Sequence, residues 1–318
     1  MEKVNERRLN RRGAWALPLF VALVALLSLP GSPAWSDPGQ TDAVRFARLM
    51  AATAYRPSPR ELRIRYLEAG SPALTAFAAA RMGDARALAR AITQDRAGYR
   101  RAIERCLPAA RAMEERVPRL LSDVETALGL DGGAPRPSVV FLFGAGRSGG
   151  TVLDHDVVIA LEVVCRFDRG SADPEALLEA FVTHEAVHFH QLRRQRPAAR
   201  DSLLRQALIE GYADLVTREV LGRTPLVQQA RARYGAAHEA RLWRAFSADL
   251  GGGGLGHWMY GPGRGDAPPD LAYWFGLRIS EAYLRVTGDS AESRRVLLDL
   301  PDPFEVLARS GYDGASDA

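Results

Sequence analysis

The stretch of sequence that decides the fold and the chemistry is residues 181–190, which read Phe-Val-Thr-His-Glu-Ala-Val-His-Phe-His. It contains the H-E-x-x-H pattern at His184, Glu185 and His188, a pattern typical of metal sites on helices. Positions four apart lie on one face of an α-helix, so two imidazoles one turn apart can bind a single metal ion. Glu185 is rotated by roughly 100° from His184 about the helix. We therefore expect its carboxylate beside the metal, where a bound water would lie.

Two histidines do not complete a catalytic zinc site, which has three protein ligands and an open position for water. A metzincin would place its third histidine six residues after the second one, but that position is Arg194, and Gln191 replaces the expected glycine. The other source is the next predicted helix, which reads Leu-Ile-Glu-Gly-Tyr-Ala-Asp over residues 208–214. We expect Glu210 to be the third ligand. Asp214 follows one turn later on the same face, where it can accept a hydrogen bond from a ligand histidine and fix its tautomer.

Two imidazoles and one carboxylate with one position open predict zinc as the ion. Gly211 follows the third ligand inside the same predicted helix. Glycine destabilises a helix interior, so its presence predicts that another backbone packs closely there.

The pattern H-E-x-x-H followed by E-G-x-A-D resembles the gluzincin clan of metallopeptidases, and within it the bacterial families of predicted zinc-dependent proteases. Other parts of the chain are similar to the same families: residues 65–71 with Phe77 and Arg81, residues 141–151 followed by 157–162, and residues 273–276, where Ala272 replaces the first glycine of a G-Y-x-x-G element. The resemblance implies a mostly helical α+β protein with a small antiparallel sheet, whose edge strand lines the substrate cleft.

The resemblance implies hydrolysis of peptide bonds in a peptide or protein substrate, as an endopeptidase or an aminopeptidase. Zinc lowers the pKa of its bound water to about 7. Glu185 would take the proton of that water while the metal polarises the substrate carbonyl, and would then pass the proton to the leaving amine.

The oxyanion of such a reaction needs a second stabilising group besides the metal. Gluzincins supply a tyrosine or a histidine downstream of the third ligand. Tyr273 is the first choice, because the Tyr-Trp-Phe-Gly sequence at residues 273–276 matches the family element. Tyr260 and His257, in a glycine-rich stretch, are the alternatives, and an ordinary core aromatic is the alternative role for Tyr273.

A second hypothesis is a non-catalytic binding protein that keeps the metal for stability on the same scaffold. Glu185 argues against it, because a purely structural metal site needs no general base.

The chain of 318 residues begins with a basic stretch, followed by an apolar run at residues 14–29 and small residues Ala34 and Ser36. This layout is typical of a secretory signal peptide over residues 1–36, and the run is short for a transmembrane helix. We expect export to the periplasm or medium. The lesser alternative is an uncleaved N-terminal anchor, which would be the only attachment to a membrane.

The charge of the chain is concentrated at its start. The formal net charge is +4, and residues 1–36 hold five basic and two acidic side chains, or +3 of it, which leaves +1 for the rest. The basic pI is therefore no evidence for nucleic-acid binding. The only lysine is Lys3, so catalysis by a lysine of the mature chain is excluded.

The two cysteines, Cys106 and Cys165, could form one disulfide in an oxidising compartment, or remain two separate buried thiols. A zinc site made from them is not expected, because neither has a cysteine or histidine at ligand spacing.

The hydrophobic pattern predicts a helical region over residues 37–130, a linker, and a zinc metallopeptidase-like domain over residues 137–318. Within the second part we expect two strands and a series of helices, in this order: strands at 139–143 and 157–164, helices at 174–194, 201–221, 226–250 and 269–286, and two short C-terminal helices.

Several other features receive structural interpretations. Gly251, Gly253 and Gly256 fit G-x-G-x-x-G, but a helix precedes them and none starts on them, which excludes a dinucleotide site. A loop over the cleft is expected instead, or a connector without a function. The remaining side chains are expected at the surface or in turns: His190 on the surface or behind a ligand, His155 in a turn, His238 on a helix surface, and a solvated basic cluster at Arg193, Arg194, Arg196 and Arg200, for which acidic substrates or membrane headgroups are the alternative.

Overall fold

The helix that contains His184 packs on one face of a small sheet, and other helices pack on the opposite face. The computed structural model describes residues 41–130, 132–168, 170, 173–195, 202–252, 255–263 and 265–315. The expected signal segment, residues 1–36, lies outside the described residues, as do Arg196, Arg200 and Gly253. Within the described part, no helix has the length and apolarity needed to cross a membrane.

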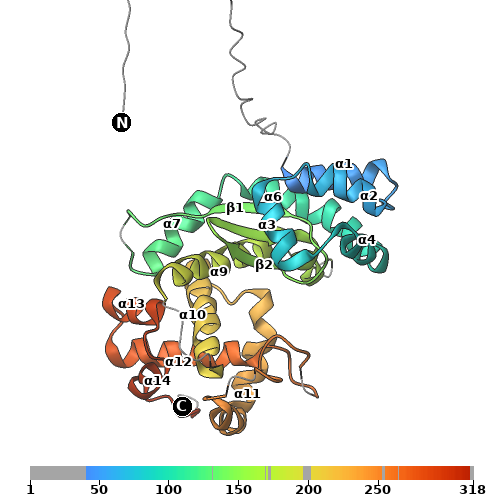
Figure 1. The fold of residues 1–318 in the computed structure, drawn as a ribbon. Helices are drawn as coiled ribbons and strands as arrows, with labels where there is room; N and C mark the ends of the chain where they lie inside the picture. Colours follow the sequence, from blue (N-terminus) through green and yellow to red (C-terminus); the bar gives the residue numbers. More distant parts are fainter. Residues whose placement is uncertain are drawn as a thin grey trace, which may run out of the picture. The chain divides into compact units, whose positions relative to one another are not determined.

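The sheet joins β1 (Ser138–Leu142), β3 (Asp156–Ala160) and β2 (Gly150–Leu153), in that order (Figure 1). The α+β, mostly helical class is confirmed, but the prediction of an antiparallel sheet is wrong, because β1 runs parallel to β3 while β2 is antiparallel to it. The physical reason is the unpredicted strand β2. A tight turn at Asp154 and His155 joins β2 to β3 and reverses the direction of the chain. β1 and β3 therefore point the same way, and β2 points the opposite way. β2 is left with one unpaired edge.

The predicted second strand ends earlier than its apolar run. Residues 157–164 were expected to be extended, but the strand stops at Ala160, and α8 (Leu161–Val164) and the 3-10 turn η4 (Cys165–Phe167) follow. The buried carboxylate of Glu162 accepts hydrogen bonds from the backbone N–H groups of Gly144 and Gly146, at 2.9 and 3.0 Å. This contact attaches α8 to the loop between β1 and β2.

The N-terminal part of the described chain contains no strand, as predicted. Its elements are α1 (Asp42–Ala52), α2 (Pro59–Leu62), η1 (Arg63–Leu67), α3 (Pro72–Phe77), η2 (Ala78–Met82), α4 (Ala85–Gln94), α5 (Arg96–Arg101), η3 (Ala102–Cys106), α6 (Leu107–Met113) and α7 (Val117–Ala127), where η1, η2 and η3 are π-helical turns.

These helices are bonded to the sheet region. The hydroxyls of Tyr66 and Tyr99 donate to the backbone carbonyls of Phe143 and Gly144 at 2.7 and 2.6 Å. Cys106 and Cys165 form a disulfide, which decides between the two expectations for these residues. The residues from Gly39 to Ala318 form one compact unit.

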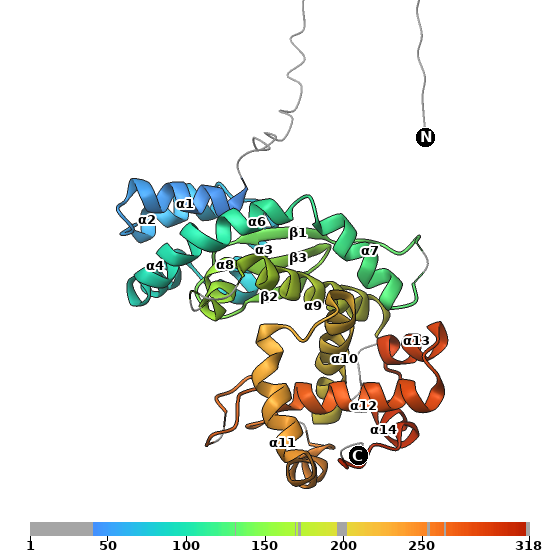
Figure 2. The same cartoon turned by 180° about the vertical axis from the view of Figure 1, so that it is seen from behind.

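The zinc-pattern helix α9 (Pro174–Arg194) has the bounds that the sequence predicts. Asp173 caps its start by accepting from the backbone N–H of Glu175 at 3.0 Å, and proline occupies its first position, where no N–H is needed. Figures 1 and 2, which view the molecule from opposite sides, show α9 and α3 on opposite faces of the sheet.

The next helix, α10 (Leu203–Leu221), packs across α12 (Leu271–Thr287) at two glycines. A Cβ atom on Gly211 would lie 2.1 Å from the backbone nitrogen of Leu277, and one on Gly276 would lie 1.6 Å from the carbonyl oxygen of Ala207. The close backbone approach predicted from Gly211 is therefore confirmed. This contact holds the helix that carries Glu210.

The remaining helices are α11 (Leu226–Asp249), α13 (Ala291–Asp299) and α14 (Pro303–Ser310). The predicted helix at 226–250 is interrupted at His238, whose backbone is not helical. Figure 1 shows α10 to α14 gathered on the side of α9 away from α1.

Candidate metal centre

Three side chains from α9 and α10 meet at one point. The Nε2 atoms of His184 and His188 lie 3.0 Å apart, and Oε2 of Glu210 lies 3.2 Å from the first and 3.1 Å from the second. Donors bound at about 2.0–2.1 Å in a tetrahedral zinc site are about 3.3 Å apart. The donor set and its spacing therefore fit zinc, and these three residues could hold the ion.

The outer nitrogen of His184 is held by a buried carboxylate. Its Nδ1 lies 3.1 Å from Oδ1 of Asp214, one turn beyond Glu210 on α10. Asp214 in turn accepts hydrogen bonds from Arg231, at 2.7 Å, and from Gln228, at 3.0 Å, both on α11. This arrangement leaves Nε2 of His184 as the atom that points at the candidate site.

His188 has its own partner, which the sequence analysis missed. Its Nδ1 lies 2.6 Å from Oε1 of Gln191, and Nε2 of Gln191 donates to the backbone carbonyl of Ile209 at 2.9 Å. Gln191 is buried and joins the two ligand helices. The signal available in the sequence was its position three residues after His188, which is on the same helix face.

When no metal is bound, the attraction between the carboxylates and the imidazoles favours ionised carboxylates and protonated imidazoles. Burial alone would lower the pKa of His184, but hydrogen bonds with Asp214 and Glu210 outweigh it and raise the pKa to about 10. Burial alone would raise the pKa of Glu210, and the neighbouring His188 and His184 hold it well below its usual range. A metal ion must displace these protons in order to bind.

Glu185 lies beside the cluster and is not one of the three converging ligands. It is buried, and burial raises the pKa of its carboxyl group, opposed by the nearby His188 and His184. Its carboxylate is packed against the first residue of β2, because a Cβ atom added to Gly150 would lie 2.4 Å from Oε1. A glycine at this position leaves the room that the carboxylate occupies.

Of the two candidate tyrosines, Tyr260 reaches the ligands through its hydroxyl, which donates to Oε1 of Glu210 at 2.8 Å. Most of Tyr260 is exposed, but desolvation of its hydroxyl raises the pKa and the charge of Glu210 adds to this effect, so the hydroxyl keeps its proton. Tyr273 stacks its ring on the ring of His184, with 6.3 Å between centroids and 12° between planes, and its hydroxyl interacts with that of Tyr260. The guanidinium carbon of Arg231 lies 4.7 Å from the centroid of the Tyr273 ring.

The third candidate, His257, is not brought to the cluster. It is exposed, and its described ring contact is with Trp258. The glycine-rich segment around it is attached to the core where it is described: Trp258 is buried and donates to Asp249 at 2.8 Å, and the backbone N–H of Tyr260 donates to Asp270 at 2.7 Å.

The expected surface position of His190 is revised, while Arg193 and Arg194 are exposed, as predicted. His190 is buried rather than exposed, and burial lowers its pKa to about 4. Arg193 lies over the Phe189 ring and donates to the carbonyl of Asp154, while Arg194 pairs with Asp299. These two arginines are thus engaged within the molecule. His155 lies in the turn between β2 and β3, as predicted.

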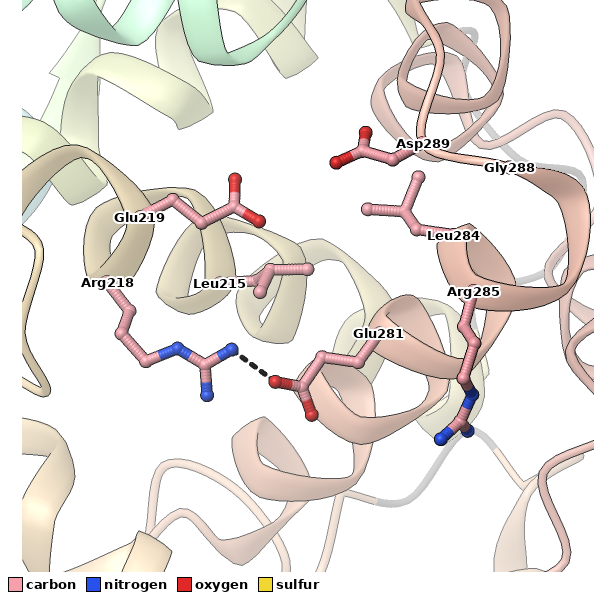
Figure 3. A pocket seen from close by; sticks show the side chains of 8 residues that line it. All are labelled: Leu215, Arg218, Glu219, Glu281, Leu284, Arg285, Gly288 and Asp289. Carbon is pink, nitrogen blue, oxygen red and sulfur yellow. Dashed lines mark hydrogen bonds and ion pairs between the residues drawn. The ribbon is translucent and has the colours of Figure 1, made fainter. Parts of the chain in front are cut away.

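A pocket of about 410 Å³ lies between α10 and α12, and it shares no residue with the metal cluster (Figure 3). Its polar lining consists of charged side chains that pair with one another or with neighbours, as Arg218 does with Glu281 and Glu219 with Arg294. It contains no imidazole.

Comparisons of the chain with protein-family models, with curated protein sequences and with solved structures find no match.

Proposed function

We propose that this chain is a zinc-dependent metallopeptidase of the gluzincin type. The observation that carries the proposal is the cluster of three donor atoms, 3.0 to 3.2 Å apart, from His184, His188 and Glu210, with Glu185 beside it. The donor chemistry fits a catalytic zinc with one position left for water or substrate.

When bound, zinc would supply a Lewis acid and an acidified water. Glu185 takes the proton of that water and delivers it to the leaving amine of the substrate. Its burial supports this role, because a carboxyl group with a raised pKa holds the proton more readily between the two transfers. Asp214 and Gln191 hold the two imidazoles in the tautomer that leaves Nε2 free to bind.

The proposed second stabiliser of the oxyanion is Tyr260 rather than the first choice, Tyr273. Tyr260 has its hydroxyl 2.8 Å from a ligand oxygen, whereas the described ring contact of Tyr273 serves to orient His184. During the reaction, Tyr260 would exchange its bond to Glu210 for one to the oxyanion.

We also propose that the chain is exported to the periplasm or the medium. The disulfide between Cys106 and Cys165 supports it, since disulfides persist in oxidising compartments. The signal-like composition of residues 1–36 supports it independently.

The test compares the purified chain with its Glu185→Gln variant for bound zinc and for hydrolysis of a heat-denatured protein. We expect both proteins to hold zinc and only the first to hydrolyse the substrate, with activity restored by zinc after removal with a chelator. Zinc in both proteins without hydrolysis in either would support the metal-stabilised binding protein instead.

A further inference from the structure

The edge strand β2 is approached from both faces of the sheet by charged side chains. From one face, Glu185 on α9 packs against Gly150. From the other, Arg81 on η2 places Nη2 at 3.2 Å and Nε at 3.4 Å from the hydroxyl of Thr151. Successive residues of a strand point to opposite faces, so the neighbours Gly150 and Thr151 bring the base and the guanidinium to the same end of the strand.

Arg81 differs in its partner from most arginines that the structure describes around the core. Those pair with carboxylates: Arg105 with Asp168, Arg136 with Glu125, Arg231 with Asp214, Arg278 with Glu239 and Arg294 with Glu219. Within the described ranges Arg81 forms no ion pair, and its hydrogen bonds go to a neutral hydroxyl. The side chain is exposed, whereas Thr151 is buried.

A buried threonine therefore orients an exposed guanidinium without neutralising it. The planar guanidinium has five N–H donors in a fixed geometry that suits a carboxylate. Two of its nitrogens face Thr151, which leaves Nη1 and the outer hydrogens for another acceptor. A solvated, unpaired arginine on a remote surface would suggest nothing further, but this one is attached to the strand that touches the proposed general base.

We propose that Arg81 is a specificity-determining residue that binds a carboxylate of the substrate close to the bond that is cleaved. The proposal rests on the proposed peptidase function, since it places the scissile bond at Glu185. One residue of extended chain spans about 3.3 Å, and Gly150 and Thr151 are adjacent. The carboxylate therefore belongs to a residue next to the scissile bond or one further. It is either an acidic side chain or the C-terminal carboxylate of a short peptide.

Binding is measured on the zinc-loaded Glu185→Gln protein, which does not consume the peptides, by fluorescence anisotropy. Four labelled peptides are compared. Each has either glutamate or glutamine next to the scissile bond, and its C-terminus is either free or amidated. We expect a preference for one kind of carboxylate of about 10- to 100-fold, in keeping with hydrogen bonds to charged groups. The glutamate–glutamine pair and the free–amidated pair identify which carboxylate is bound.

In the Glu185→Gln protein, the further substitution Arg81→Gln should remove this preference and leave the affinity for the neutral amidated peptide unchanged. The substitution Arg81→Glu should reverse the preference. Arg86→Gln, at an exposed arginine on α4, is the matched control and should change nothing. Equal affinities for all four peptides, or no measurable binding of any, would overturn the inference. Hydrolysis by the chain with Glu185 intact is measured in parallel. A binding preference without cleavage refutes the peptidase function, and with it the place of the carboxylate beside a cleaved bond, but keeps Arg81 as a carboxylate-binding residue. Cleavage without a preference refutes the role of Arg81 alone.

Discussion

Helix α10 presents carboxylates to two different sites, and their partners differ. Glu210 is buried against the imidazoles of His184 and His188. Asp214 is buried between His184 and Arg231, whereas Glu219, which lines the pocket of Figure 3, pairs with Arg294. An arginine keeps its proton at any working pH, so its ion pair with a carboxylate is complete in itself. A histidine can release its proton and offer a lone pair to a metal. Acidic side chains of α10 thus contact imidazoles in the candidate metal centre and a permanently charged arginine elsewhere.

Removing a ligand should have the largest effect. Glu210→Ala takes away the carboxylate on which both imidazoles converge, so we expect loss of bound zinc, loss of hydrolysis and a lower melting temperature, because metal binding is coupled to folding. His184→Ala should behave in the same way. Glu219→Ala, on the same helix, is the control and should keep both zinc and activity. Metal analysis and thermal unfolding measure the difference, and zinc retained in both ligand variants would refute the ligand set.

Substitution of the two tyrosines tests which hydroxyl acts on the substrate, since that of Tyr260 bonds to Glu210 and that of Tyr273 interacts with Tyr260. Tyr260→Phe removes the hydroxyl bonded to Glu210 and should lower kcat by about 100- to 1000-fold with little change in KM, by analogy with loss of one oxyanion donor. Tyr273→Phe keeps the ring stacked on His184 and should retain most of the activity. The opposite result would return the role to Tyr273, and normal activity in both would leave the metal as the only stabiliser.

The residues behind the histidines should have intermediate effects. Asp214→Asn and Gln191→Leu each alter the partner of one ligand imidazole, so zinc affinity or activity should fall by about 10- to 100-fold. Competition with a chelator gives the affinity, and Gln229→Leu, at a half-buried glutamine of α11 that takes no part in the centre, is the control. An unchanged affinity in Gln191→Leu would show that its bond to His188 does not matter for the metal.

The glycine contact between α10 and α12 can be tested by unfolding of the metal-free chain. Alanine favours a helix over glycine by about 1 kcal/mol, but at Gly211 a methyl group would meet the backbone of Leu277 at 2.1 Å. We expect Gly211→Ala to lower the free energy of unfolding by about 1–3 kcal/mol, as overpacking does. Denaturant unfolding measures it. A gain in stability would mean that the two helices separate easily.

A buried histidine, His190, provides the smallest test. The pKa of His190 is about 4 in the folded protein and 6.5 when unperturbed, so the unfolded chain binds its proton first as the pH falls. Stability from this residue is full above about pH 6.5 and is lost as the pH falls toward 4, by on the order of 1–3 kcal/mol. His190→Gln should therefore lose less stability than the original chain between pH 7 and pH 4.5 in thermal unfolding of the metal-free proteins. Parallel losses would contradict the shift.

The sequence by itself determined the elements that depend on local spacing. The bounds of α9 follow from Asp173, Pro174 and the apolar period, and the position of His184 one turn before His188 requires only that the helix forms. Gly211 predicted a close backbone neighbour because glycine is otherwise unfavourable in a helix. Sequence alone also placed Glu210 and Asp214 on one face of the next helix, since they are four residues apart.

Only the tertiary structure decided which separate segments meet. β2 was missed because it is short and contains glycine, and the parallel pairing of β1 with β3 depends on it. Gln191 contacts α10, Arg231 lies over the ring of Tyr273, and Arg81 bonds to Thr151, and no local pattern connects the members of these pairs. The choice between Tyr260 and Tyr273 likewise depends on how the chain folds back after α11. Contacts between residues far apart in the chain are set by packing and by loop geometry, and neither has a period that can be read from the sequence.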